Sequence, residues 1–178
     1  TLVAIKAHTV ETGSITDSLA VVGDDFGKSE EAARLRLIRL IARLGDAALM
    51  QRVITEVIAN EGCAEALRTE AVAQIADNAP AAYPDFCRLA ATLASGAVRD
   101  AVLSGMNRII VRSEDEAAVP QYVVSALEQK ALKNAAEKEA FIDAVSRHRT
   151  GEALKAVVVF LEDPETVAAA VKAMEIGR

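Results

Sequence analysis

Hydrophobic residues recur at three- and four-residue intervals through almost the whole chain after residue 28, in short stretches that end at a glycine, a proline or an acidic turn. This interval places apolar side chains on one face of a helix, so the pattern predicts a succession of short helices. In the first stretch one stripe is formed by Leu37, Ile38, Ile41 and Leu44, and Gly45 follows as a stop signal. We therefore predict an all-α fold after the first 28 residues.

Nine helices are expected, beginning near residues 31, 46, 64, 84, 97, 120, 135, 152 and 164. Two of these starts have a capping signal of their own. Asp46 can cap the second helix, and Asp163 followed by Pro164 marks the ninth. Pro120 lies too deep for a straight helix that starts at Ser113, so we expect a loop or short turn before the sixth helix.

The first 28 residues have a different pattern. Segments 2–10 and 15–22 are rich in β-favouring and apolar residues, with a turn signal at residues 12–14 between them. We predict an extended or β-hairpin arm here, and a short helix beginning near Asp17 is the competing interpretation. An isolated two-stranded ribbon is marginal in water, so such an arm needs the helical body or another subunit to lie against.

Alternate helices begin at nearly regular intervals. The odd-numbered ones start near residues 31, 64, 97, 135 and 164, at spacings of about 33, 33, 38 and 29 residues, in the range of helical-hairpin repeats. Residues 66–72 (ALRTEAV) are also similar in sequence to residues 97–102 (AVRDAV). On these features the chain resembles HEAT-type α-solenoids over roughly residues 30 to 177. The resemblance implies antiparallel helical hairpins stacked as a short solenoid, with an arm or linker over residues 1–28 and a helical-repeat domain over residues 29–178.

The resemblance to HEAT-type repeats is incomplete. In that family a recurring proline in the first helix, and a recurring Asp and basic residue in and after the turn, help to define the repeat. Gly45 and Asp46 fit the pattern, whereas the turns at residues 78–79 and 150–151 do not. An irregular helical bundle is therefore the alternative fold.

The composition agrees with closely packed helices and argues against several functions. Apolar residues make up 52% of the 178 residues but aromatic ones only 3%, so the core is built from Ala, Val, Leu and Ile. The net charge of −6 argues against a nucleic-acid surface. The sequence shows no secretory signal and no apolar stretch near the roughly 20 residues that span a bilayer. We expect a soluble protein, with a cytoplasmic location slightly favoured; the start at Thr1 rather than Met leaves a removed leader or an excised fragment open.

Charge is unevenly distributed around the first helix. Residues 34–53 hold five arginines and one aspartate, whereas residues 11–31 hold six acidic residues and one lysine. Arg36, Arg39 and Arg43 form one stripe, which is our candidate interaction surface. The simpler interpretation of this stripe is a solvated helix face. The functional one is a dock for an acidic partner, such as the protein's own acidic N-terminal segment, folded back or donated by a neighbour.

No motif in the sequence predicts catalysis or ligand binding. The phosphate-binding, dinucleotide-binding, zinc-protease and serine-hydrolase patterns are all absent. His8 and His148 have no second ligand at helical spacing, and His148 is better explained as a residue near the last carbonyls of a helix. Cys63 and Cys87 form no CxxC pair, and we predict two reduced thiols too far apart to bridge, with Cys87 in the core. The sequence thus predicts no catalytic residue, no cofactor and no metal site.

These observations favour a non-enzymatic protein-binding scaffold of the helical-repeat type. The alternative is a self-assembling structural subunit, of a homopolymer or shell, that uses residues 1–28 as an exchanged arm. An enzyme with a site assembled from scattered carboxylates or His148 is a third interpretation. Because the last helix has no hairpin partner of its own, Val167, Val171 and Met174 are candidates for end-face self-association. The expected partners are another protein or a second copy, without nucleic acid or membrane.

Overall fold

A computed structural model describes Phe26 and residues 30–176. All regular secondary structure in this part of the chain is helical, which confirms the predicted all-α class. The predicted arm over residues 1–28, with its competing helix near Asp17, lies outside the described residues apart from Phe26. Contacts divide the chain into two compact units, Thr1–Ala79 and Pro80–Arg178, a boundary that the hydrophobic pattern did not predict.

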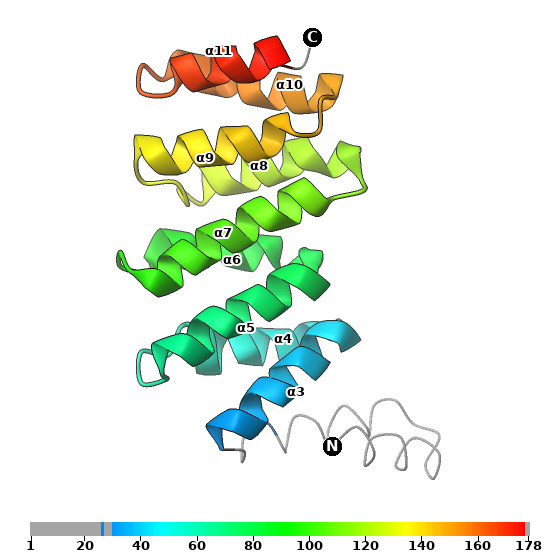
Figure 1. Ribbon diagram of the computed structural model, residues 1–178, viewed down its shortest axis with the longest axis vertical. Helices are drawn as coiled ribbons and strands as arrows, with labels where there is room; N and C mark the ends of the chain where they lie inside the picture. The colour runs from blue at the N-terminus through cyan, green and yellow to red at the C-terminus, as the bar shows by residue number, and fades with distance from the viewer. Residues whose placement is uncertain (1–25, 27–29, 177–178) are drawn as a thin grey trace. The chain divides into compact units, whose positions relative to one another are not determined.

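The described part of the first unit contains three α-helices and one π-helical turn, and Figure 1 shows their arrangement. α3 (Glu31–Leu44) packs against α4 (Ala47–Val53) and α5 (Glu65–Asn78), and α4 continues into a π-helical turn, η1 (Ile54–Ile58), that packs on α5. The core consists of fully buried aliphatic side chains from all three helices: Ile38, Ile41, Val53, Val57, Ile58, Ala71 and Ile75. Three residues of the stripe predicted for the first helix, Leu37, Ile38 and Ile41, are buried, whereas Leu44 at its end is 45% exposed.

The turn between α3 and α4 has the two caps that the sequence predicts. Gly45 has a φ of 68°, in the left-handed region, and its N–H donates to the Ile41 carbonyl at 3.1 Å. The Asp46 side chain accepts a hydrogen bond from the Leu49 N–H at 2.9 Å. Both termini at this turn are therefore satisfied by residues a few positions away, which is why local sequence was sufficient to find them.

Replacing Asp46 by alanine is expected to lower the free energy of unfolding of the first unit by about 1 kcal/mol, because the Leu49 N–H loses its acceptor. Urea unfolding followed by far-UV circular dichroism measures the change. Asp46→Asn keeps a side-chain oxygen and is the control, expected within a few tenths of a kcal/mol of the parent. An alanine variant as stable as the asparagine variant contradicts the capping role.

The described part of the second unit, residues 80–176, contains six α-helices with short helical turns before or after three of them. They are η2 (Pro80–Ala82), α6 (Tyr83–Thr92), α7 (Ala97–Arg112), η3 (Glu116–Ala118), α8 (Val119–Glu128), α9 (Ala135–Ser146), α10 (Gly151–Val157), η4 (Val158–Glu162) and α11 (Val167–Ile176). The predicted short turn before the sixth helix is confirmed as η3, which leads into α8 with Pro120 in its first turn. The ninth helix begins later than expected. Asp163 does accept from the Glu165 N–H at 3.0 Å, but the next residues form a turn before α11 starts at Val167.

The helices of the second unit lie in two layers. α9 packs between α7 and α11 in one layer, and α8 packs between α6 and α10 in the other. The α7, α9 and α11 layer is nearer the viewer in Figure 1. Fully buried residues such as Phe86, Met106, Phe141 and Val145 fill the space between the layers. The Phe141 ring of α9 also contacts the Phe160 ring of η4, with centroids 6.2 Å apart.

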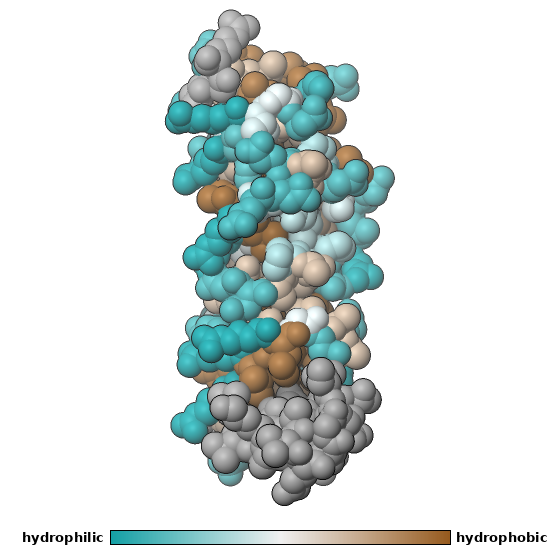
Figure 2. Space-filling view, turned by 90° about the vertical axis from the view of Figure 1, so that its right-hand side faces the viewer, coloured by the Kyte–Doolittle hydropathy of each residue, from teal (hydrophilic) through white to brown (hydrophobic). Residues whose placement is uncertain are grey.

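On the face drawn in Figure 2, most of the coloured surface is hydrophilic, and hydrophobic residues are visible in separate patches. Within residues 30–176 no helix is both long enough and apolar enough to cross a membrane.

Candidate functional site: a groove between α7 and α9

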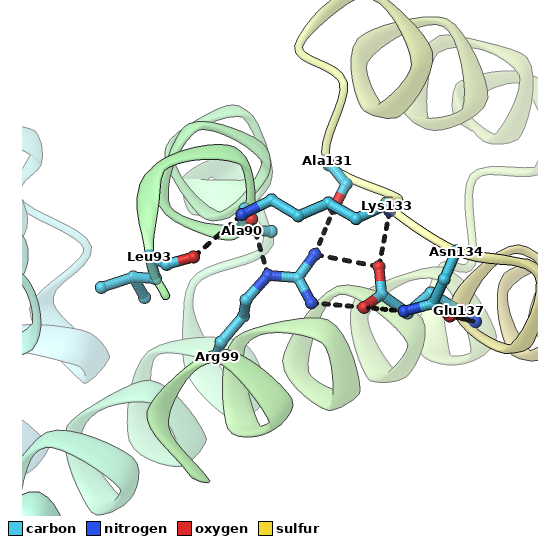
Figure 3. A network of polar contacts seen from close by, with 7 residues as sticks. All are labelled: Ala90, Leu93, Arg99, Ala131, Lys133, Asn134 and Glu137. Atoms are coloured by element: carbon cyan, nitrogen blue, oxygen red, sulfur yellow. Dashed lines mark hydrogen bonds and ion pairs between the residues drawn. The ribbon is translucent and has the colours of Figure 1, made fainter. Parts of the chain in front are cut away.

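Arg99, the third residue of α7, is only 3% exposed and makes contacts with three other segments (Figure 3). Its Nε donates to the Ala90 carbonyl of α6 at 2.9 Å, and its Nη2 donates to the Ala131 carbonyl after α8 at 3.0 Å. Both terminal nitrogens also bind the carboxylate of Glu137 on α9, Nη2 to Oε2 at 2.9 Å. A planar guanidinium is suited to this task because its donors point in several fixed directions at once.

Glu137 receives further hydrogen bonds from the start of its own helix. Its carboxylate accepts from the Lys133 N–H at 2.6 Å and from Asn134 Nδ2 at 2.8 Å. The Glu137 N–H in turn donates to Asn134 Oδ1 at 3.0 Å, so Asn134 caps α9. The hydrogen bond from Arg99, with smaller contributions from Lys133 and Asn134, outweighs burial and lowers the pKa of Glu137 to about 2. The same contact raises the pKa of Arg99.

This polar network fixes the ends of four helices relative to one another. It joins the C-terminal end of α6, the start of α7, the segment after α8 and the start of α9. Lys133 adds a second link, because its Nζ donates to the Leu93 carbonyl after α6 at 2.9 Å. The separation of α7 and α9 is therefore set by hydrogen bonds as well as by packing.

Two adjoining cavities form one groove along α7 and α9. They hold about 360 Å³ and about 380 Å³ and share Ser104, Asn107 and Ala140 in their walls. Toward the N-terminal ends of both helices, the wall also contains Asp100, Leu103, Leu132, Ala136 and Glu137. Toward the C-terminal ends, it contains Arg108, Val111, Arg112, Asp143, Ala144 and Arg147.

Small side chains leave the space that becomes the groove. Ala136, Ala140 and Ala144 follow one another at four-residue intervals on α9, and Ser104 of α7 lies in the same walls. Residues four apart lie on one face of a helix, so these alanines form a stripe without bulk beyond Cβ. A further cavity of about 330 Å³ continues the same layer between α9 and α11.

The two ends of the groove differ in charge. Asp100 lies at one end, whereas Arg108, Arg112 and Arg147 lie at the other. Arg147 forms an ion pair at 2.9 Å with Asp143, but both side chains are more than 60% exposed, so the pair is weak. Arg108 and Arg112 have interactions of their own. With three arginines and one aspartate in its wall, the C-terminal end of the groove favours an acidic ligand.

The predicted arginine stripe lies on α3. Arg36, Arg39 and Arg43 are all exposed, and Arg39 Nη2 lies 3.1 Å from Glu70 Oε1 of α5. Arg39, the central arginine of the stripe, therefore links α3 to α5 through this ion pair. Whether the stripe is also an interaction surface stays a prediction. The other two arginines of residues 34–53 are Arg34 and Arg52. They lie over the buried ring of Phe26, 5.8 and 5.7 Å from its centroid.

The predicted end-face residues lie on one side of α11. This helix packs against α10 and η4, so the expectation that the last helix has no hairpin partner is wrong. Val167 and Val171 are 38% and 45% exposed, and Met174 is partly buried. The structure thus leaves this apolar stripe accessible to solvent.

The isolated histidine and cysteines have structural surroundings. His148 lies just after α9, and its Nε2 is 2.6 Å from the carbonyl of Ile110 in the last turn of α7, so it contacts the end of a neighbouring helix rather than of its own. Both cysteines are free, and Cys87 is fully buried, as predicted. Burial raises the pKa of the Cys87 thiol to about 12, so the reactive thiolate is disfavoured.

Sequence reasoning missed the roles of Arg99 and Glu137, although one signal pointed to Arg99. The similarity between residues 66–72 and 97–102 places Arg68 opposite Arg99. In the first unit, Arg68 Nε donates to the Ile58 carbonyl at 2.8 Å, just as Arg99 Nε donates to the Ala90 carbonyl. In both units, an arginine near the start of one helix binds the end of the preceding helical segment. The faint repeat in sequence therefore corresponds to a repeated contact.

Across the described residues, no group of three or more His, Cys, Asp or Glu side chains is arranged to hold a metal ion. Comparison of the chain with protein-family models, with curated proteins and with solved structures found no match.

Proposed function

We propose that this chain is a non-enzymatic helical-repeat scaffold that binds a segment of another protein in the groove between α7 and α9. The observation that carries the proposal is the pair of adjoining cavities, which share a small-residue wall and differ in charge at their far ends. A small-molecule site has polar groups that converge on one point. Here the charged groups are spread along the two helices, which suits an elongated ligand.

The arrangement of the helices supports the repeat interpretation. α7, α9 and α11 contact one another in sequence, as do α6, α8 and α10. Together with the matching contacts of Arg68 and Arg99, this order favours stacked helical hairpins of the HEAT-like type over an irregular bundle. In such an array each layer presents parallel helices whose grooves can bind a chain along their length.

The dimensions and charges of the groove define the expected ligand. From Asp100 to Arg112 the axis of α7 rises by about 18 Å, which is the length of five or six extended residues. Leu103 and Leu132 lie in the wall near the Asp100 end, and the three arginines lie at the other. We therefore infer a peptide with apolar residues at one end and Asp or Glu at the other.

Panning a random peptide display library against the intact chain tests this function. Enriched peptides are expected to share an apolar end and an acidic end, and to bind more weakly as salt rises because part of the attraction is between exposed charges. Ala140 is exposed and belongs to both cavity walls, so Ala140→Arg is expected to obstruct the groove without disturbing the core. Affinity for the enriched peptides should fall at least about tenfold.

Ala48→Arg is the matched control, because Ala48 is also an exposed helical alanine but lies on α4 in the first unit. It should leave peptide binding unchanged. Equal binding by the parent and Ala140→Arg, or enrichment of peptides that Ala48→Arg also loses, contradicts the assignment of the site to this groove.

A further inference from the structure

The solvent-accessible side of α11 has the same position relative to its buried residues as a side of α9 that is covered. On α9 the buried residues Phe141 and Val145 are followed directly by Ile142 and Ser146. These two residues are also buried, and they line the cavity against α11. Thr166, directly before α11, and Ala170 and Ala173 on α11 are buried. The residues that follow them are Val167, Val171 and Met174, and they form the accessible stripe.

The opposite side of α11 is already occupied. Ala169 and Ala173 line the cavity that α11 shares with α9. Val171 follows Ala169 by two residues and precedes Ala173 by two, so it projects from the other side of the helix. The stripe of Val167, Val171 and Met174 therefore lies where the next helix of this layer would pack.

The adjacent segment adds apolar surface to the same end of the unit. α11 packs against α10 and η4. The buried stripe of α10 and η4 consists of Ala153, Val157 and Phe160. Each of these residues is followed directly by an aliphatic one, as on α11: Leu154, Val158 and Leu161. Of these, Val158 is 45% exposed. Hydrophobic residues are visible at the top of the space-filling view, at the end where α11 lies (Figure 2).

We propose that this end face binds the same face of a second copy of the chain, in a two-fold symmetric dimer. An isologous contact places each patch against itself, so the patch must not carry a net charge at its centre. The exposed charges beside Val171 on α11 are Lys172 and Glu175, one of each sign, and they do not make the face self-repelling. The corresponding residue on α9, Ile142, is 1% exposed and lines the cavity against α11.

The size of the face determines what kind of dimer it forms. Two helical segments of 10 to 12 residues, about 15 to 18 Å long and about 10 Å apart, present roughly 350 Å² in outline, so the two copies together bury roughly 700 Å² of surface. This area is typical of weak, transient contacts and lies below that of stable interfaces. The dimer is therefore dependent on concentration rather than permanent.

Analytical ultracentrifugation of the intact chain, from about 1 µM to about 1 mM, tests the proposal. The parent should pass from monomer to dimer, and Val171→Asp should weaken the dimer at least about tenfold, because two like charges then meet across the two-fold axis. Val124→Asp is the matched control: Val124 is 46% exposed on α8, and its variant should dimerise like the parent. A parent that stays monomeric throughout, or equal effects of the two substitutions, overturns the proposal.

Cross-linking separates the symmetric dimer from head-to-tail assembly. In a Cys63→Ser background, Val171→Cys is expected to form a disulfide with its own counterpart under mild oxidation, whereas Val124→Cys is not. Mass that grows beyond the dimer, without a Val171→Cys disulfide, means that the face binds a different surface of the next copy and overturns the two-fold arrangement.

Discussion

Replacing Arg99 by methionine is expected to lower the free energy of unfolding of the Pro80–Arg178 unit by roughly 3–5 kcal/mol. Methionine fills much of the same volume but donates no hydrogen bond. The substitution leaves the carbonyls of Ala90 and Ala131 without a donor and leaves the Glu137 carboxylate, 13% exposed, without its cation. An uncompensated charge and two unsatisfied carbonyls account for the size of the effect.

The two tyrosines of the sequence allow this unit to be observed on its own. Tyr83 and Tyr122 both belong to it, with ring centroids 4.5 Å apart between α6 and α8. Urea unfolding followed by tyrosine fluorescence therefore reports on the second unit, while circular dichroism reports on both. The expected result is an earlier fluorescence transition for Arg99→Met.

Arg147→Met is the matched control for Arg99→Met. Arg147 also pairs with a carboxylate, but its side chain and that of Asp143 are 62% and 66% exposed, so the same substitution should cost less than about 1 kcal/mol. The double variant Arg99→Met with Glu137→Leu is expected to be less destabilised than the sum of the two single variants, because it removes both charges together. Equal stability losses for Arg99→Met and Arg147→Met contradict a structural role for the buried network.

Acidification from about pH 5 to about pH 2 is expected to remove roughly 3 kcal/mol of stability from the same unit through Glu137 alone. The pKa of this carboxyl is about 2 in the folded chain, against an ordinary value of 4.5. Since the folded pKa is the lower one, the stabilisation is complete above the unfolded pKa and is lost as the pH falls through the folded pKa. About half of it is lost by pH 3.

The comparison with Glu137→Gln isolates this contribution. Glutamine cannot ionise, so the difference in unfolding free energy between the parent and this variant should shrink as the pH falls from 5 to 3. Asp163 changes in the same direction, because its hydrogen bond from Lys138 lowers its pKa, but it is common to both proteins and cancels in the difference. A difference that stays constant over this range contradicts the assignment of the low pKa to Glu137.

Several features of the candidate groove, and one of the arginine stripe on α3, could not be predicted from the sequence. The stripe of Ala136, Ala140 and Ala144 appeared in the sequence only as helix-favouring residues, and its function as a groove wall depends on the distance to Ser104 of α7. Arg99 and Glu137 are 38 positions apart, and no local pattern relates them. The candidate surface at Arg36, Arg39 and Arg43 was visible as a stripe, but the pairing of Arg39 with Glu70 on another helix was not.

The sequence by itself determined the helical class, most helix boundaries and the caps at Gly45 and Asp46, because each depends on residues within one or two turns of one another. Tertiary structure decided which side of each helix is covered, and with it the buried ion pair, the groove and the exposed face at Val171. These features arise between segments tens of residues apart, where the period of a single helix gives its apolar face but not the neighbour that covers it.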